Sequence, residues 1–353
     1  MDTVQINEKI NIADIARESD DIRIGVIGCG YWGPNLVRNF VELPKADLVV
    51  VSDLRNERLR FIQHTYPQVQ VVNDYHELFN MNLDAIIIAT PPVTHFEIAK
   101  EVILHGLHVL IEKPMTLNSV HAQILIDMAR QRDLVLMVGH AFEYNVAVQT
   151  LRTMISNGDL GAIRYIDSAR LNLGLYQNGT NVLWDLAPHD ISILCYILDM
   201  EPLAVCAQGA HCIVSNVYDV VYMNLIFPEN ILAHVHVSWL DPYKVRRVTA
   251  VGSKKMVIFN DIENKKINII DKGVNTPADA STFTDFQYSY RNGDILVPYI
   301  RFVEPLRQET QHFIDCITNH ISPITNGEDG LRVVKVLEAA QRSLENNSRE
   351  EAI

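Results

Sequence analysis

Residues 22–33 of the chain read IRIGVIGCGYWG, and this stretch decides the fold. Its first half is apolar, which predicts a buried parallel strand, and the amphipathic run after residue 33 predicts a helix. Between strand and helix stand three glycines in the spacing GxGxxG, at Gly28, Gly30 and Gly33. A strand, a glycine turn and a helix in this order form the fingerprint of a dinucleotide-binding unit.

Each glycine has a physical task in such a unit. Gly28 permits the tight turn, Gly30 lets the backbone approach a pyrophosphate, and Gly33 lets the helix pack close to the strand. The N-terminus of the helix offers free N–H groups and a partial positive charge to the phosphates. The same spacing also occurs in purely structural glycine turns, so the prediction needs a second signal.

A second strand, residues 46–52, supplies that signal because it ends in Asp53. An acidic residue about 20 positions after the glycines is placed to meet the adenosine ribose. A carboxylate accepts hydrogen bonds from the ribose hydroxyls and repels a 2′-phosphate, so Asp53 predicts NAD rather than NADP. Arg55 could pair with that phosphate, although we interpret it as a solvated residue at a helix start.

Length, charge and cysteine content limit the class of protein. At 353 residues the chain suits two domains, and its net charge of −13 argues against nucleic acid or an anionic membrane as partner. A local arginine cluster could still bind an anionic substrate. The five cysteines include no CxxC pair, which favours a reducing, cytoplasmic compartment. Cys206, His211 and Cys212 fit no zinc spacing, so we expect no metal site.

The order of apolar patterns predicts an α/β protein with an N-terminal extension at 1–21 and two domains. Over 22–141 strands alternate with helices, as a doubly wound parallel Rossmann sheet requires. Residues 142–353 predict an α/β domain for substrate binding and oligomerisation, built on a large, mainly antiparallel sheet. One face of that sheet is expected to be open, which predicts a homodimer or homotetramer.

Two features near the C-terminus complete the prediction. Asn292-Gly293 predicts the turn of a hairpin over residues 288–294. The last helix is predicted at about 330–346, and the polar chain after it is expected to fray. The sequence contains no apolar run long enough to span a membrane, and its acidic N-terminus is unlike a signal peptide.

Two segments carry residues suited to moving a proton and stabilising charge. Lys113 follows an apolar strand at the sheet edge where ligands bind, and its ammonium group could stabilise an alkoxide. Asp185 and His189 are four residues apart on a predicted helix and share a face. A carboxylate that holds one imidazole nitrogen leaves the other free to accept a proton. The alternatives are a helix cap at Asp185 with a core role for His189, and Asp190 as the partner.

Four segments together resemble the glucose–fructose oxidoreductase / inositol dehydrogenase (Gfo/Idh/MocA) family over about residues 22–345. They are GCGYWG at 28–33, ATPP at 89–92 with His95, EKP at 112–114, and Asp185-x-x-x-His189. EKP is the most specific of these signatures. The resemblance implies a Rossmann domain, an open-faced substrate domain, and Lys113 and His189 as the catalytic pair with Asp185 beside them.

The resemblance also implies the binding residues. The expected cofactor-binding set is Gly28, Cys29, Gly30, Tyr31, Trp32, Gly33, Asp53, Leu54, Arg55, Thr90, Pro91, Pro92, His95, Glu112 and Lys113. The expected substrate-binding set is Lys113, Tyr144, Asn145, Arg170, Asn172, Tyr176, Asp185 and His189. Five of these, Tyr144, Asn145, Arg170, Asn172 and Tyr176, fit ordinary strand-end or loop roles equally well. The chain departs from the family at Ala187-Pro188, because the family often has glycine at the first of these positions.

Residues 30–40 and 181–190 further resemble a bacterial branch that oxidises nucleotide sugars at C3, of the UDP-N-acetylglucosamine type. That resemblance implies NAD-dependent oxidation of a sugar hydroxyl to a ketone, which a PLP-dependent aminotransferase would then consume. The alternatives are a keto-sugar reductase or an inositol or free-sugar dehydrogenase of the same family. An NAD-binding regulator without turnover is the alternative from another class.

Overall fold

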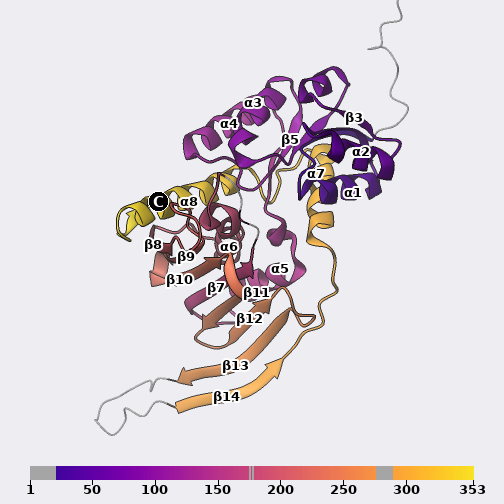
Figure 1. The fold of residues 1–353 in the computed structure, drawn as a ribbon. Helices are drawn as coiled ribbons and strands as arrows, with labels where there is room; N and C mark the ends of the chain where they lie inside the picture. Colours follow the sequence, from indigo (N-terminus) through magenta and orange to yellow (C-terminus); the bar gives the residue numbers. More distant parts are fainter. Residues whose placement is uncertain (1–20, 175, 177–178, 276–288) are drawn as a thin grey trace, which may run out of the picture.

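The computed structural model describes residues 21–174, 176, 179–275 and 289–353. Nearly all of the expected extension at 1–21 therefore lies outside the described residues. The described chain builds two sheets, each with its own helices, which stand one above the other in Figure 1. The first sheet is built before residue 140 and the second after residue 162. Helices α7 and α8 then return to the first sheet.

The first sheet consists of six described strands, all parallel, in the order β3-β2-β1-β4-β5-β6. The order reverses between β1 and β4, and a ligand binds beyond the carboxyl ends of the strands at such a reversal. The elements are β1 Ile22–Ile27, α1 Gly33–Glu42, β2 Ala46–Ser52, α2 Asn56–Thr65, β3 Gln70–Val72, η2 Tyr75–Asn80, β4 Ala85–Ile88, η3 Pro92–Thr94, α3 His95–Leu104, β5 His108–Glu112, α4 Ser119–Gln131 and β6 Leu136–Gly139.

This sheet is apolar on both faces because helices cover both. Ile24 and Val26 of β1 are fully buried in the core on one face, and Ile27 is buried in the core on the other. Such continuous burial is typical of parallel sheets, and it is why these strands read as unbroken apolar runs in the sequence.

The second sheet consists of nine described strands in the order β14-β13-β12-β11-β7-β10-β9-β8-β15. Among these pairs only β7 and β10 are parallel, so the predicted α/β fold with a mainly antiparallel second sheet is confirmed. Its elements are η4 Ala141–Tyr144, α5 Val146–Ser156, β7 Ile163–Leu173, α6 Val182–Leu198, β8 Ala204–Ala210, β9 Val220–Ile226, η5 Pro228–Asn230, β10 Leu232–Ser238, β11 Leu240–Gly252, β12 Met256–Asn260, β13 Ile267–Asn275, β14 Ser289–Leu296, α7 Pro305–Asn319, α8 Gly327–Glu345 and β15 Glu351–Ala352.

The two faces of this second sheet differ in polarity. Residues alternate between buried and accessible along β9 and β10, and α5, α6 and α8 share a core with the buried face. The opposite face carries Tyr165, Tyr222 and Leu232, which are between 45% and 47% exposed. Leu232 of β10 pairs with Tyr165, and Tyr222 pairs with His236 four residues further along β10. The Tyr222 ring stacks on the His236 ring, with centroids 4.2 Å apart.

The two C-terminal helices connect the sheets. The Phe313 ring of α7 meets the Phe40 ring of α1 edge to face, with centroids 6.5 Å apart. The first turn of α8 lies so close to β6 that a Cβ added at Gly330 would be 2.7 Å from Val138. Because α8 also packs against β8 and α6, one rigid helix touches both sheets.

Two C-terminal predictions are wrong. Asn292 and Gly293 lie within β14, where Asn292 pairs with Lys272 of β13, so the ladder overrides the local turn signal. A Cβ at Gly293 would be 2.4 Å from the Asp271 carboxylate, which explains the glycine there. The chain after 346 does not fray either, because Glu351 pairs with Val205 of β8. Tyr288, where the predicted hairpin begins, lies outside the described residues.

The sequence predicts neither a membrane-spanning segment nor a metal site. None of the described helices is both long and apolar enough to pass through a membrane. Within the same described residues, no three histidine, cysteine, aspartate or glutamate side chains are grouped as metal ligands would be.

Candidate active site

The glycine loop after β1 has the geometry of a dinucleotide-binding turn. Gly28 has φ +96°, and a Cβ there would be 2.6 Å from the carbonyl oxygen of Ala89. A Cβ at Gly33 would be 2.3 Å from the carbonyl oxygen of Gly28, so the helix touches the loop backbone. A Cβ at Gly30 would have Nη2 of Arg55 as its nearest neighbour among the described residues, at 3.6 Å. The loop is therefore close-packed at two glycines and accessible to a ligand at the third.

The N-terminus of α1 faces this loop without a side-chain cap. Its N-cap residue Trp32 makes no capping hydrogen bond, and Pro34 occupies the start of the helix. Uncapped N–H groups at a helix start favour an anion, so the backbone fits the phosphates of a dinucleotide. Tyr31, Trp32 and Leu54 form an exposed rim around the loop, with exposed fractions of 84%, 40% and 87%.

Asp53 stands at the end of β2 with its carboxylate on the glycine loop. Its Oδ2 accepts a hydrogen bond from the N–H of Cys29 at 2.7 Å, and its Oδ1 accepts from the N–H and Nε of Arg55 at 2.9 and 3.1 Å. Burial would raise the pKa of Asp53, but these hydrogen bonds hold it below its usual value. Arg55 is thus not merely solvated, as the sequence suggested, because it spans Asp53 and the space beside Gly30.

The loops after β4 and β5 are joined through a buried imidazole. Nδ1 of His95 lies 2.9 Å from the Pro114 carbonyl oxygen, and Nε2 lies 2.9 Å from the Thr90 carbonyl oxygen. His95 is 0% exposed, so it fixes these loops from behind and does not face the cleft. Thr90 is further held by the hydroxyl of Thr94 at 2.7 Å, and Pro91 and Pro92 complete the loop before α3.

Glu112 ends β5 beneath the glycine loop. Burial raises the pKa of Glu112 to about 7, although Lys113 and a hydrogen bond from the Trp32 side chain oppose that rise. Its Oε2 accepts a hydrogen bond from the N–H of Lys113 at 3.2 Å. A Cβ at Gly139 of β6 would be 3.1 Å from this carboxyl group, so the glycine makes room for it.

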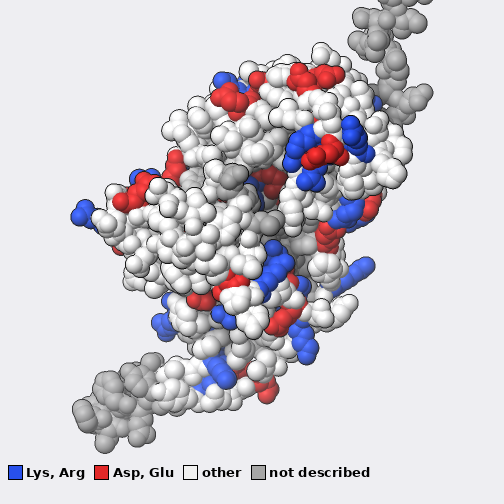
Figure 2. Space-filling view, in the orientation of Figure 1, with Lys and Arg blue, Asp and Glu red and all other residues white. Residues whose placement is uncertain are grey.

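Lys113 reaches from the first sheet to α6. Its Nζ donates a hydrogen bond to the main-chain carbonyl of Asp185 at 2.7 Å and lies 3.7 Å from Oδ1 of the same residue. The lysine and aspartate side chains are only 18% and 17% exposed. In Figure 2 a hollow opens between the two halves of the molecule, with both basic and acidic atoms visible inside it.

His189 follows Asp185 by one turn of α6, which continues unbroken through Ala187-Pro188. Burial lowers the pKa of His189 well below its usual value, and the charges of Lys113, Arg170, Arg246 and His140 lower it further. The imidazole is therefore neutral at physiological pH and able to accept a proton.

The predicted carboxylate partner of His189 is not observed. Nδ1 of His189 is buried and has no hydrogen-bond partner among the described residues. Asp185 accepts from Nε1 of Trp239 at 2.9 Å, and Asp190 accepts from Ser168 and from Nε of Arg170, both at 2.6 Å. Both carboxylates are thus engaged by donors that the helix phase alone does not reveal.

The expected substrate residues divide into two groups. Arg170 is buried above the Phe142 ring, and the hydroxyl of Tyr176 donates to Asp219 at 3.2 Å. Asn172 is half-buried on β7 next to them. In the second group, Tyr144 is 3% exposed with its hydroxyl on Thr325, and Asn145 caps α5. Nδ2 of Asn145 also donates to Asp261, the carboxylate that pairs with Arg246.

Sequence reasoning missed three residues around His189. The Phe142 ring lies 5.2 Å from the imidazole, centroid to centroid, and Arg246 of β11 lies 6.0 Å from the Phe142 ring. His140 is 1% exposed, and neither ring nitrogen has a partner among the described residues. The signal for Phe142 is its position just after the last parallel strand, where the sequence predicts only Tyr144 and Asn145 as site residues.

Comparisons with known proteins match both parts of the chain to one family. The model of the oxidoreductase family with an NAD-binding Rossmann fold (GFO_IDH_MocA) matches residues 22–140, and that of the GFO/IDH/MocA C-terminal domain matches residues 148–258. The chain is 24% identical over 336 residues to myo-inositol 2-dehydrogenase of Thermotoga maritima, covering 92% of this chain and 96% of that protein.

A second relative is UDP-N-acetylglucosamine 3-dehydrogenase of Acidithiobacillus ferrooxidans, which is 26% identical over 319 residues, or 89% of this chain and 94% of that protein. A solved structure of this dehydrogenase superposes with a TM-score of 0.77 at 24% identity and covers 93% of this chain and 99% of that one. The two family models together match well over half of the sequence. The chain therefore belongs to the Gfo/Idh/MocA family of oxidoreductases, with an NAD-binding Rossmann fold at its N-terminal end.

Proposed function

We propose that the chain oxidises a secondary hydroxyl of a sugar to a ketone, with NAD as hydride acceptor, and that the substrate is a nucleotide sugar oxidised at C3. The observation that carries the proposal is the hydrogen bond from Lys113, at the end of β5, to the carbonyl of Asp185, one helical turn before His189 on α6. The glycine loop, the uncapped start of α1 and Asp53 fit a dinucleotide at the edge of the first sheet.

The two residues have complementary tasks in this reaction. Neutral His189 accepts the hydroxyl proton, while the ammonium group of Lys113 stabilises the oxygen as negative charge develops on it. The carbonyl of Asp185 holds Nζ of Lys113 in place at 2.7 Å. Bound NAD would take the hydride from the same carbon. In the reverse direction His189 returns the proton, so a keto-sugar reductase uses the same residues.

Charge near the site supports an anionic substrate despite the net charge of −13. Arg170 and Arg246 both lie within 6.0 Å of the Phe142 ring, next to His189. Each arginine pairs with one carboxylate, Arg170 with Asp190 at 2.6 Å and Arg246 with Asp261 at 3.5 Å, yet both arginines still lower the pKa of His189. The similarity to a UDP-N-acetylglucosamine 3-dehydrogenase supports the nucleotide sugar, and the similarity to a myo-inositol 2-dehydrogenase supports inositol as the second candidate.

A panel experiment tests the proposal. Nucleotide sugars, free sugars and inositols are each offered with NAD and with NADP, and turnover is followed by the absorbance of the reduced nicotinamide. UDP-N-acetylglucosamine with NAD is expected to give the highest kcat/KM, and a PLP-dependent aminotransferase is expected to consume the ketone. Preference for an inositol would identify the second candidate. Tight NAD binding with no turnover on any substrate would indicate a regulator.

A further inference from the structure

The inference concerns what holds His189 in place, since its Nδ1 has no hydrogen-bond partner among the described residues. It therefore rests on the proposed function, in which His189 is the base. In the part of the chain that the structure describes, the ring contact of His189 is with Phe142, whose plane is tilted 68° to the imidazole. The guanidinium of Arg170 lies over the same phenyl ring, 4.4 Å from its centroid.

Phe142 belongs to η4, a short 3₁₀ turn between β6 and α5. A turn of four residues has little rigidity of its own, so its position depends on what its neighbours bind. The next residue, Glu143, accepts a hydrogen bond at Oε1 from the hydroxyl of Ser192 at 2.6 Å. Glu143 and Ser192 are 4% and 2% exposed, and Ser192 follows His189 by three residues on α6.

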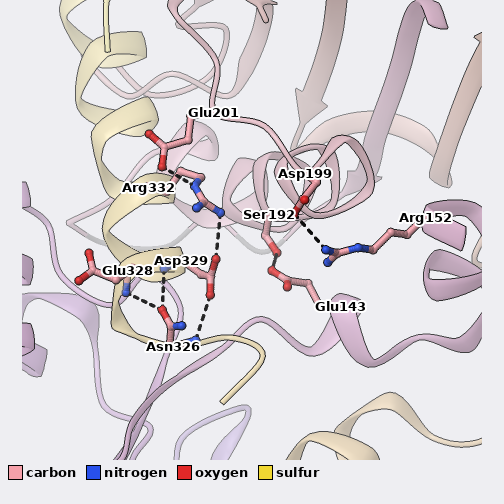
Figure 3. A network of polar contacts seen from close by, with 9 residues as sticks. All are labelled: Glu143, Arg152, Ser192, Asp199, Glu201, Asn326, Glu328, Asp329 and Arg332. Atoms are coloured by element: carbon pink, nitrogen blue, oxygen red, sulfur yellow. Dashed lines mark hydrogen bonds and ion pairs between the residues drawn. The ribbon is translucent and has the colours of Figure 1, made fainter. Parts of the chain in front are cut away.

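The charged residues near Glu143 pair with one another, which leaves its carboxyl group to the hydrogen bond with Ser192. Behind it lies a polar cavity of about 190 Å³, and Figure 3 shows the charged residues around it. Arg152 pairs with Asp199 at 3.0 Å, while Arg332 pairs with Asp329 at 2.9 Å and with Glu201 at 3.0 Å. No ion pair joins either arginine to Glu143 among the described residues.

We propose that Glu143 is a positioning residue: its hydrogen bond with Ser192 fixes η4 against α6, so that Phe142 holds His189 in its reactive orientation and keeps water from Nδ1. Glu143 and Ser192 act through Phe142, since among the described residues they are hydrogen-bonded to each other and not to Lys113, Asp185 or His189. The bond joins the turn that carries the phenyl ring to the helix that carries the base.

The protonation state of Glu143 decides which substitution preserves its hydrogen bond with Ser192. Burial raises the pKa of Glu143 to about 8. The hydrogen bond from Ser192 and the charges of Arg332 and Arg152 oppose this rise, and the charge of Asp329 adds to it. The carboxyl is thus protonated at neutral pH, and glutamine reproduces its shape, its lack of charge and its acceptor oxygen. The cationic and titratable groups that face His189 are Lys113, Arg170, Arg246 and His140, and none of them is changed in the variants below.

The experiment compares Glu143→Ala, Ser192→Ala and Glu143→Gln with Asp199→Asn. Asp199 is the control because it lines the same cavity at the end of α6, 83% exposed, in a left-handed conformation that asparagine tolerates. Glu143→Ala and Ser192→Ala should each lower kcat by about 10- to 100-fold, with the KM for NAD unchanged, because the base is misplaced by a fraction of an ångström to an ångström. Glu143→Gln and Asp199→Asn should keep wild-type kcat.

A second readout does not depend on turnover. NMR titration of the histidine C2–H signals, with His189 assigned from its absence in His189→Asn, reports the His189 pKa directly. That pKa should rise toward its ordinary value in Glu143→Ala and Ser192→Ala, because water reaches the imidazole, and should stay low in Glu143→Gln. Unchanged His189 titration and kcat in folded Ser192→Ala would overturn the proposal. If no substrate is turned over but the titration shifts as expected, the positioning role stands and the proposed reaction fails.

Discussion

Nζ of Lys113, at the end of β5, donates a hydrogen bond to the main-chain carbonyl of Asp185 in α6, 72 residues later in the chain. This single contact joins the sheet that carries the glycine loop to the helix that carries His189. A charge-assisted hydrogen bond from a side chain that is 18% exposed holds the ammonium group more firmly than a surface ion pair would.

Removal of either side chain that we propose as catalytic, Lys113 or His189, should abolish most of the turnover. General base catalysis contributes about 10²–10⁴-fold and one preorganised charge donor about 10²–10³-fold. We therefore expect Lys113→Ala and His189→Ala each to lower kcat by about two orders of magnitude or more. The double variant should be far less impaired than the product of the two, because the groups act as a unit. Stopped-flow and steady-state assays with the identified sugar measure this.

The matched control is His234→Ala, since His234 lies on the open face of β10 and contacts Asn224. It should retain wild-type kcat, and His189→Ala should retain wild-type NAD affinity because the glycine loop is intact. Near-normal turnover of His189→Ala at every pH would show that the histidine is structural.

The pH profile should report the environment of His189. Its pKa is lowered by burial and by Lys113, Arg170, Arg246 and His140, so the neutral, active form persists below pH 6.5. Activity should fall only as the pH drops through that lowered value. Arg246→Gln removes one of the cations and should move the acidic limb of the kcat profile to higher pH.

Arg247→Gln is the control for that shift, because Arg247 is the next residue of β11 and pairs instead with Asp167 at 3.9 Å. An acidic limb that stays in place in both variants would mean that another group sets the profile.

The parts of the site that follow parallel strands could be predicted from the sequence. Gly28, Asp53 and Lys113 each follow an apolar run, and the carboxyl ends of parallel strands meet at one edge, so strand order alone brings them together. The helical spacing of Asp185 and His189 likewise places them one turn apart.

The remaining features depend on contacts that are distant in sequence. The direction of η4 decides that Phe142 faces His189 while Tyr144 turns into the core, and four residues of 3₁₀ turn leave no periodic signal. The sequence does not predict β7. This strand lies between β10 and β11, and its partner residues stand 60 or more positions later in the chain. Asn292-Gly293 lies in a strand because Asn292 pairs with Lys272 of the preceding strand, β13.

Cofactor choice depends on the pair formed by Asp53 and Arg55. The Asp53 carboxylate is held on the glycine loop by the Cys29 N–H at 2.7 Å, where a 2′-phosphate would meet it. We expect NAD to bind at least about tenfold more tightly than NADP, a difference of about 1.4 kcal/mol. Arg55→Ala should widen the preference, because it removes the cation nearest that phosphate. Titration of tryptophan fluorescence measures both affinities, and equal affinities in the wild type would show that Arg55 governs the site.

The open face of the second sheet should be buried against another copy of the chain. Leu232 lies opposite Tyr165 there, and Tyr222 lies opposite His236 on the same face, each of the three being nearly half exposed. Stable interfaces cover about 800 Å² per partner with an apolar centre. We expect light scattering to give a dimer or tetramer at micromolar concentration.

Leu232→Glu should dissociate this assembly, because a charge would be buried at the centre of the interface. Leu104→Glu, an equally exposed leucine on α3, should leave the assembly unchanged. A wild-type protein that is monomeric at micromolar concentration would contradict the prediction and leave the apolar face to another partner.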